Sequence, residues 1–76
     1  MTEIRLDLRG LKCPLPAMKT RKALERARRG SILLVECTDP LAAIDLPNLA
    51  RETGDAFLSR SEADGYAIYR IRKVGA

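Results

Sequence analysis

The 76-residue sequence contains no histidine and no tryptophan, and it has only two cysteines. Without histidine, a Ser-His-Asp triad, a Cys-His pair and a histidine-ligated metal site are all excluded. The two thiols, Cys13 and Cys37, are too few to form a zinc cluster. We therefore expect neither a metal nor an organic cofactor, and each cysteine needs its own explanation.

Long apolar runs are also lacking. The longest uncharged apolar run, Ile32 to Val35, is far too short to cross a bilayer. Residues 1–9 alternate apolar and charged side chains and contain no hydrophobic region typical of a secretory signal. These features predict a cytoplasmic protein, and in that compartment both cysteines are reduced thiols.

The length limits what the protein can enclose. With 46% hydrophobic and 32% charged residues, the chain is expected to fold as one domain over residues 1–76. A domain of this size buries only about 60% of the surface that its unfolded chain exposes. A deep substrate pocket is therefore not expected, and any chemistry should take place near the surface.

Basic residues are concentrated in the first half of the chain, and the net charge of the whole is +4. Six of them fall within one short stretch: Lys19, Arg21, Lys22, Arg26, Arg28 and Arg29. Such a cluster produces a positive field over one element and favours an acidic partner, either a protein or a nucleic acid.

The first half of the sequence has the pattern of a strand, a helix and a second strand. Apolar and charged residues alternate over residues 4–9, which predicts a strand with one solvated face. Apolar residues recur every three or four positions over residues 14–29, which predicts an amphipathic helix that Gly30 ends. Residues 31–38 are rich in Ile, Leu and Val and predict a second strand, parallel to the first.

The second half predicts a helix and a hairpin. The helix should start at Asp39-Pro40 and be short or broken, because Pro47 suits the first turn of a new helix. Gly54 should close it. Residues 56–61 and 66–73 have the pattern of two strands joined through Ala63-Asp64-Gly65.

These elements together predict the fold class. Their order is β-α-β-α-β-β, and four strands with two helices suit an α/β (α+β) sandwich of two layers. We expect a four-stranded mixed sheet with both helices on one face. The other face of the sheet should then be open to solvent or to a partner.

Cys13 lies between the end of the first predicted strand and the start of the first helix. Pro14 should keep Cys13 extended, in a position like an N-cap, and itself occupy the first helical position. The free amides of the first turn, such as that of Leu15, together with the helix dipole and the side chains of Arg9 and Lys12, should favour a thiolate. This setting predicts a pKa for Cys13 below the usual value of about 8.5.

The surrounding residues limit what a thiolate at this position can do. A thioredoxin-like dithiol would need a second cysteine where Pro16 stands, and hydrolytic catalysis would need a base such as histidine. The remaining role is that of a nucleophile that accepts a group and passes it on. Sulfane sulfur is the natural cargo, because a thiolate can attack a sulfur-sulfur bond and form a persulfide.

The segment Cys13-Pro14-Leu15-Pro16 resembles the TusA/SirA-type sulfur carriers, whose signature is Cys-Pro-x-Pro at the start of the first helix. The resemblance covers nearly the whole chain and includes Asp7, Gly10, Met18, Arg21-Lys22, Asp39-Pro40 and Asp45-Leu46-Pro47. It implies the same β-α-β-α-β-β sandwich. It also implies a sulfurtransferase-type persulfide relay on Cys13, rather than an enzyme that turns over on its own.

The resemblance further implies two kinds of partner. The sulfur donor would be a cysteine desulfurase or a rhodanese-like protein, and the acceptor would be a second protein. In related proteins the sulfur serves tRNA thiolation, molybdenum-cofactor synthesis or sulfur oxidation, and some relatives work in selenium metabolism or thiosulfate uptake. The sequence leaves the pathway open. We expect a monomer that forms transient complexes, with dimerisation through the open sheet face as the alternative.

Several residues near the motif have candidate roles. Arg21 and Lys22 lie about two turns beyond the thiol and match the family pattern, so they are candidates for partner docking. Met18 belongs either to the core or to an apolar docking rim. Asp39 is expected first as a helix-start residue and second as a partner contact. Gly10 should supply backbone freedom in the loop before the thiol.

Cys37 has a different expected role. It continues the apolar face of Leu33 and Val35 and should be a small core residue. The alternative is that it resolves a Cys13 persulfide as a disulfide, because the two cysteines should lie at the same edge of a parallel β-α-β unit. Asp45 is expected to have only a structural role at a helix start.

Two other functions remain open. The sequence pI of 9.5 and the basic helix favour an RNA-binding module, although Phe57, Tyr66 and Tyr69 do not form a stacking platform. A regulatory or adaptor domain could also keep the motif without moving sulfur. Replacing Cys13 with alanine would abolish sulfur transfer but leave electrostatic RNA binding almost intact.

Overall fold

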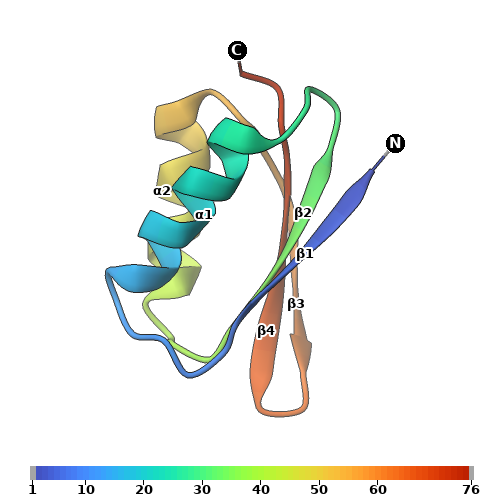
Figure 1. Ribbon diagram of the computed structural model, residues 1–76. Coiled ribbons are helices and arrows are strands. Elements are labelled where there is room, and N and C mark those ends of the chain that lie inside the picture. Colours follow the sequence, from blue (N-terminus) through green and yellow to red (C-terminus); the bar gives the residue numbers. More distant parts are fainter. Residues whose placement is uncertain (1, 76) are drawn as a thin grey trace.

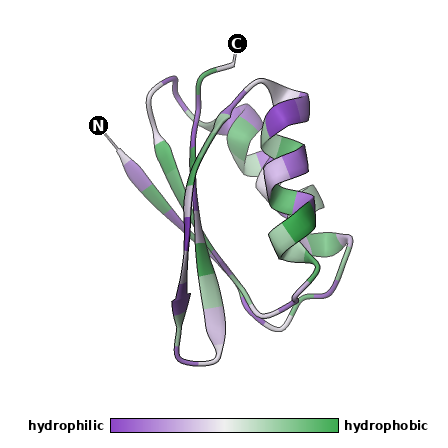
Figure 2. Ribbon diagram, turned by 180° about the vertical axis from the view of Figure 1, so that it is seen from behind, coloured by the Kyte–Doolittle hydropathy of each residue, from purple (hydrophilic) through white to green (hydrophobic). Residues whose placement is uncertain are grey.

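The computed structural model describes residues 2–75 and has the predicted order of elements. The elements are β1 (Glu3–Leu8), α1 (Leu15–Arg26), β2 (Ile32–Cys37), α2 (Ala42–Thr53), β3 (Ala56–Ala63) and β4 (Tyr66–Arg72). The strands form one mixed sheet in the order β1-β2-β4-β3. Figures 1 and 2 show both helices on the same face of this sheet, which confirms the predicted two-layer fold.

The two strands that flank α1 are parallel, as the sequence predicts. Their register pairs Leu8 with Cys37, so β1 and β2 end together at the same edge of the sheet. The loop that carries Cys13 follows β1, and the loop that begins α2 follows β2. Figure 1 shows these two loops side by side below the helices. The start of α1 therefore lies next to the start of α2.

The core lies between the helices and the sheet. Alternation along β2 turns Leu33, Val35 and Cys37 toward the helices, and all three are buried. Each is paired in the sheet with a residue of β4 that is also buried, such as Tyr69 opposite Val35. Cys37 is 2% exposed, so the predicted core role is confirmed.

The first helix is shorter than its pattern predicts. It begins at Leu15 and ends at Arg26, with Ala27 already extended. The predicted stop, Gly30, instead belongs to the turn before β2, where it has a φ of +91° and donates to the Lys73 carbonyl. The backbone of this turn thus bonds to the residue that follows β4. Arg28 and Arg29 therefore lie outside the helix.

The second helix is continuous, so the prediction that it is short or broken is wrong. Pro47 lies inside it and deprives only the Ala43 carbonyl of a helical donor. Ala43 is exposed, so water can satisfy that carbonyl. The buried side chains of Leu46 and Leu49, on either side of Pro47, hold the helix against the core. It ends at Gly54, whose φ of +80° confirms the predicted cap.

The hairpin follows the prediction closely. Asp64 and Gly65 form a two-residue turn between β3 and β4, and Gly65 has a φ of +84°, which glycine adopts without steric cost. β3 continues to Ala63, two residues beyond its predicted end.

Within the described part of the chain, neither helix is long and apolar enough to cross a membrane.

Candidate functional site

The thiol of Cys13 is exposed at the start of α1. The Cys13–Pro14 peptide bond is cis, and Pro14 is the N-cap, one residue later than the sequence predicts. The chain turns tightly here, because the Leu15 amide donates to the Lys12 carbonyl over 2.9 Å. Pro16 is buried beneath the first turn of the helix. The Cys-Pro-x-Pro segment thus turns the chain into α1 and leaves Cys13 at the surface.

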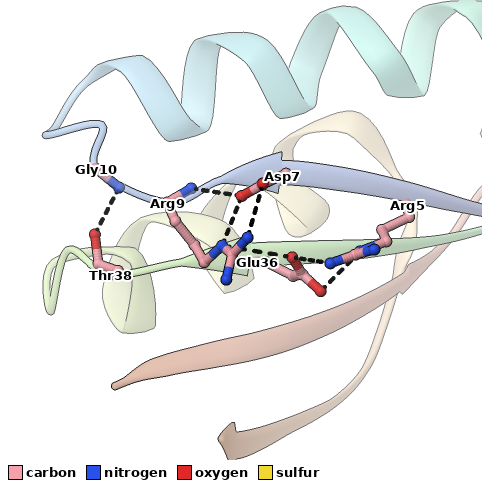
Figure 3. A network of polar contacts seen from close by, with 6 residues as sticks. All are labelled: Arg5, Asp7, Arg9, Gly10, Glu36 and Thr38. Carbon is pink, nitrogen blue, oxygen red and sulfur yellow. Dashed lines mark hydrogen bonds and ion pairs between the residues drawn. The ribbon is translucent and has the colours of Figure 1, made fainter. Parts of the chain in front are cut away.

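Two hydrogen bonds hold the loop after β1 against the loop after β2. The Gly10 amide donates to the Thr38 hydroxyl over 2.9 Å (Figure 3), and the Cys13 amide donates to the Asp39 carboxylate. The other oxygen of Asp39 accepts the Leu41 amide over 3.0 Å, at the entry to α2. Gly10 has a φ of +87°, so it supplies the predicted backbone freedom. Cys13 is therefore positioned by the neighbouring loop as well as by its own.

The environment of the sulfur is acidic, contrary to the prediction. Cys13 Sγ donates a hydrogen bond of 3.1 Å to Asp45 Oδ2 in the first turn of α2. This bond, partial desolvation and the charges of Asp45 and Asp39 raise the pKa of Cys13 above its ordinary value. The predicted lowering of this pKa is wrong. One expected donor to the sulfur, the Leu15 amide, is already bonded to the Lys12 carbonyl.

Arg9 takes part in a different network, on the sheet face opposite the helices (Figure 3). Its guanidinium binds the carboxylate of Asp7 over 2.9 and 3.0 Å and lies 3.8 Å from Glu36, which also binds Arg5. It also stacks 5.1 Å from the ring centre of Tyr66. Hydrogen bonds from Arg9 lower the pKa of Asp7 to about 2. The structure thus assigns Arg9 to this network, and not to the predicted thiolate environment.

Asp39 is the second carboxylate that acts on the thiol, and the charge of Lys12 acts on it in turn. Hydrogen bonds from the Leu41 and Cys13 amides lower the pKa of Asp39, and the charge of Lys12 lowers it further. Asp39 therefore has the helix-start role that the sequence predicts, together with the contact to Cys13 that the sequence does not reveal.

Two open depressions meet at Cys13. The first, with a volume of about 510 Å³, lies between the two loops and is lined by residues 10–13 and 38–41. The second, of about 360 Å³, lies between α1 and α2, and we call it the interhelical groove. Its lining residues are Cys13, Pro14, Ala17, Met18, Arg21, Asp45, Asn48, Leu49 and Glu52. Access from two sides agrees with the expectation of surface chemistry.

Large apolar side chains are exposed at the starts of both helices. We call these four residues the apolar rim: Leu15, Met18, Leu41 and Ile44. Met18 is 57% exposed. The prediction that it belongs to the core is therefore wrong, and its exposure agrees with the alternative role in an apolar docking rim. Exposed apolar groups at the starts of two neighbouring helices favour a surface that other proteins contact.

The basic residues of the first half are spread over the molecule. Arg21 lies in the interhelical groove and binds Glu52 of α2 over 2.8 Å. Lys22 is exposed on the outer side of α1, next to Met18 in a shallow surface depression. Arg26 is at the far end of the helix, about 16 Å along its axis from Leu15. Arg21 and Lys22 therefore lie close to the apolar rim, as does Lys19, which lines the same depression as Leu15 and Met18.

The structure adds no support for an RNA-binding surface. Tyr69 is buried, and Arg9 covers the ring of Tyr66. Phe57 packs against Tyr69 with a distance of 6.5 Å between ring centres. Bases stack on exposed aromatic rings that lie side by side on a sheet, and these three rings do not provide such a platform.

Asp45 contacts the thiol of Cys13, although sequence reasoning assigned it first a structural role at a helix start. A signal for it was present, because parallel β1 and β2 bring the starts of both helices to one edge of the sheet, and Asp45 is in the first turn of α2. The exact contact with Cys13 depends on how the helices pack.

Among residues 2–75, no three His, Cys, Asp or Glu side chains are grouped so that they could hold a metal ion.

Comparison with known proteins gives consistent results. The sequence profile of the family described as "Sulfurtransferase TusA" matches residues 4–73. A Neisseria meningitidis serogroup A protein, named provisionally as a sulfur carrier, is 43% identical over 65 residues, which cover 86% of this chain and 88% of that protein. The sulfur carrier protein TusA of Allochromatium vinosum is 35% identical over 90% of both chains. That of Pseudomonas entomophila is 37% identical over 90% of this chain and 85% of its own.

Proposed function

The chain belongs to the TusA sulfurtransferase family, and from this premise we propose that it is a sulfur carrier that holds sulfane sulfur as a persulfide on Cys13. The observation that carries the proposal is the exposed thiol of Cys13 at the junction of two open depressions. A carrier must present its sulfur to two proteins in turn, so an open site suits it better than a closed pocket. Cys37, buried in the core, has no such access.

The transfer needs no oxidant, reductant or cofactor. The donor is a cysteine desulfurase or a rhodanese-like protein that carries a persulfide of its own. Cys13 Sγ attacks the outer sulfur of that persulfide, the sulfur-sulfur bond of the donor breaks, and the donor keeps its inner sulfur as a thiol. The proton of Cys13 ends on that thiol. The reverse sequence of bonds passes the sulfur from Cys13 to the acceptor.

Docking takes place at the apolar rim around Cys13, which donor and acceptor would both cover. Arg21, Lys22 and Asp39 line the depressions beside it and supply polar contacts at its edge. Two partners that need the same surface exclude each other, so the carrier forms short-lived complexes with one partner at a time. The acceptor decides whether the sulfur serves tRNA thiolation, molybdenum-cofactor synthesis or sulfur oxidation.

The intact mass of the protein tests this proposal. After incubation with a cysteine desulfurase and cysteine, we expect a gain of one sulfur atom that dithiothreitol removes and that peptide mapping places on Cys13. Removal by dithiothreitol is essential, because two added oxygens give nearly the same mass as one sulfur. Cys13→Ala should not gain sulfur, whereas Cys37→Ala should. A wild-type protein that gains nothing from the desulfurase, or from a rhodanese with thiosulfate, would overturn the proposal.

A further inference from the structure

The hydrogen bond between Cys13 and Asp45 joins the segment before α1 to the first turn of α2, beside the interhelical groove. Cys13 precedes α1, and Asp45 belongs to α2, 32 positions later in the chain. The sulfur is the donor and the carboxylate oxygen the acceptor, at a separation of 3.1 Å. This contact therefore requires a proton on the sulfur.

A persulfide cannot make the same contact. Once Cys13 Sγ is bonded to a second sulfur, it has no proton to donate. The outer sulfur ionises more readily than a thiol, and its negative charge then lies close to the Asp45 carboxylate. Like charges at such short range repel each other. The carboxylate thus interacts favourably with the empty protein and unfavourably with the loaded one.

We propose that Asp45 is a positioning residue that stabilises the empty carrier relative to the loaded one: it holds the Cys13 thiol in the groove and repels the persulfide anion from it. This inference rests on the proposed function. Its consequence is that the sulfur is held loosely and passes readily to an acceptor. The repulsion also directs the outer sulfur away from α2 and toward a docked partner.

The charged groups around the thiol support this role. Asp45 faces it from α2 and Asp39 from the loop after β2, and both raise the pKa of Cys13, the hydrogen bond to Asp45 being the largest cause. On the side of the thiol's own loop, Lys12 acts on Asp39. From α1, the guanidinium of Arg21 is bound to Glu52 at 2.8 Å. The groups acting directly on the sulfur are therefore carboxylates.

The exchange of sulfur with a small thiol makes the relative stability of the empty and the loaded protein measurable as an equilibrium constant. Cys13 thiol and glutathione persulfide give Cys13 persulfide and glutathione. One sulfur-sulfur bond breaks, one forms, and the proton of Cys13 passes to the glutathione sulfur. Asp45 stabilises the left side through its hydrogen bond and destabilises the right side through its charge, so removing that charge should shift the equilibrium toward the loaded protein.

The empty protein provides the first test. The rate at which iodoacetamide alkylates Cys13 is measured against pH in wild type, Asp45→Asn and Asp45→Glu, with Asp64→Asn in the exposed hairpin turn as the matched control. We expect the pH profile of Asp45→Asn to move to lower pH than that of wild type. The profile of Asp45→Glu should stay closer to that of wild type, because the carboxylate is kept, and the profile of Asp64→Asn should be unchanged. Each unit of movement makes alkylation about threefold faster at neutral pH, because tenfold more thiolate is partly offset by lower nucleophilicity. An unmoved Asp45→Asn profile overturns the inference.

The loaded protein provides the second test. Each variant is equilibrated with glutathione persulfide, and the ratio of loaded to empty protein is read from the intact mass. We expect this ratio to rise about threefold to tenfold in Asp45→Asn, as for the loss of one hydrogen bond of ordinary strength. A ratio equal to that of wild type overturns the inference. If wild type takes up no sulfur from any donor, the proposed function fails instead, and the alkylation profile still decides whether Asp45 holds the thiol.

Discussion

At the scale of single residues, the two cysteines differ in what surrounds each sulfur. Cys13 is bonded through both its amide and its thiol, to Asp39 and to Asp45, yet its side chain stays exposed. Cys37 is packed in the core, where burial raises its pKa to about 11. A thiol that is both protonated and inaccessible is inert, which leaves the exposed Cys13 as the candidate for the sulfur-carrying cysteine.

Asp39 should control how firmly Cys13 is held. Replacing Asp39 with alanine leaves the amides of Cys13 and Leu41 without their acceptor, so the loop before α1 should loosen. We expect the Cys13 amide to exchange its hydrogen about fivefold faster or more, the factor for one ordinary hydrogen bond. Hydrogen exchange measured by NMR provides the readout. The same substitution at Asp64 is the control, and equal exchange in both variants would refute the holding role.

At the scale of elements, α1 has a buried side and an exposed side. Pro16, Thr20 and Leu24 are buried against the core, whereas Met18 and Arg21 face outward or into the groove. The ion pair between Arg21 and Glu52 joins the helices, but an exposed pair of this kind contributes only about 0–1 kcal/mol. The outward side can therefore change with little effect on folding.

Charge reversal separates docking from stability. We expect Arg21→Glu to slow sulfur loading by a cysteine desulfurase severalfold, because it reverses a charge next to the apolar rim, while the free energy of unfolding falls by no more than about 1 kcal/mol. Loading is measured by mass at two salt concentrations, and stability by urea unfolding. Arg29→Glu, beyond the far end of α1, is the matched control. Equal loading by both variants would remove Arg21 from the docking surface.

At the scale of the whole molecule, Asp55 links two segments at the end of the molecule opposite Cys13. Its carboxylate accepts the amides of Val74 and Gly75 at 2.8 Å each and the hydroxyl of Thr53 at 2.7 Å. Gly75 lies so close that an added Cβ would be 2.7 Å from the Thr53 carbonyl oxygen. Asp55 thus ties the segment after β4 to the end of α2. Figure 1 shows this junction at the end of the sheet away from the loop that carries Cys13.

Removing this junction should affect stability and not chemistry. Asp55→Ala leaves two backbone amides without an acceptor, and we expect it to lower the free energy of unfolding by about 2–3 kcal/mol. Urea unfolding measures this loss. Sulfur loading of the folded variant should stay at the wild-type level, because the site is at the other end of the sheet. A variant as stable as wild type would contradict this account.

The same junction predicts how acid acts on wild type. Burial alone would raise the pKa of Asp55, but the Thr53 hydroxyl and the amides of Gly75 and Val74 lower it overall. A carboxyl group whose pKa is lower in the folded state contributes stability above its unfolded value of about 3.9, and that contribution is lost as pH falls through the folded value. Urea unfolding of wild type should therefore show stability falling below about pH 4, with a smaller fall in Asp55→Asn.

The sequence by itself determined the order of elements, the apolar face of each and the position of the reactive thiol. These features depend on local patterns: alternation along β1 and β2, the three- and four-residue spacing of α1, and the turn at Asp64 and Gly65. The Cys-Pro-x-Pro segment placed a cysteine at a helix start in the same way. Such patterns arise from the geometry of neighbouring residues, so they can be recognised without the rest of the chain.

Only the tertiary structure decided what the thiol contacts. Asp45 lies 32 positions from Cys13, and packing of α2 beside α1 brings it to the sulfur, which reverses the predicted direction of the pKa. Arg9, close to Cys13 in sequence, turns to Glu36 on the other face of the sheet. The continuity of α2 through Pro47 likewise depends on burial of the residues beside it. Charges act through space, and their distances are set by packing that no local pattern contains.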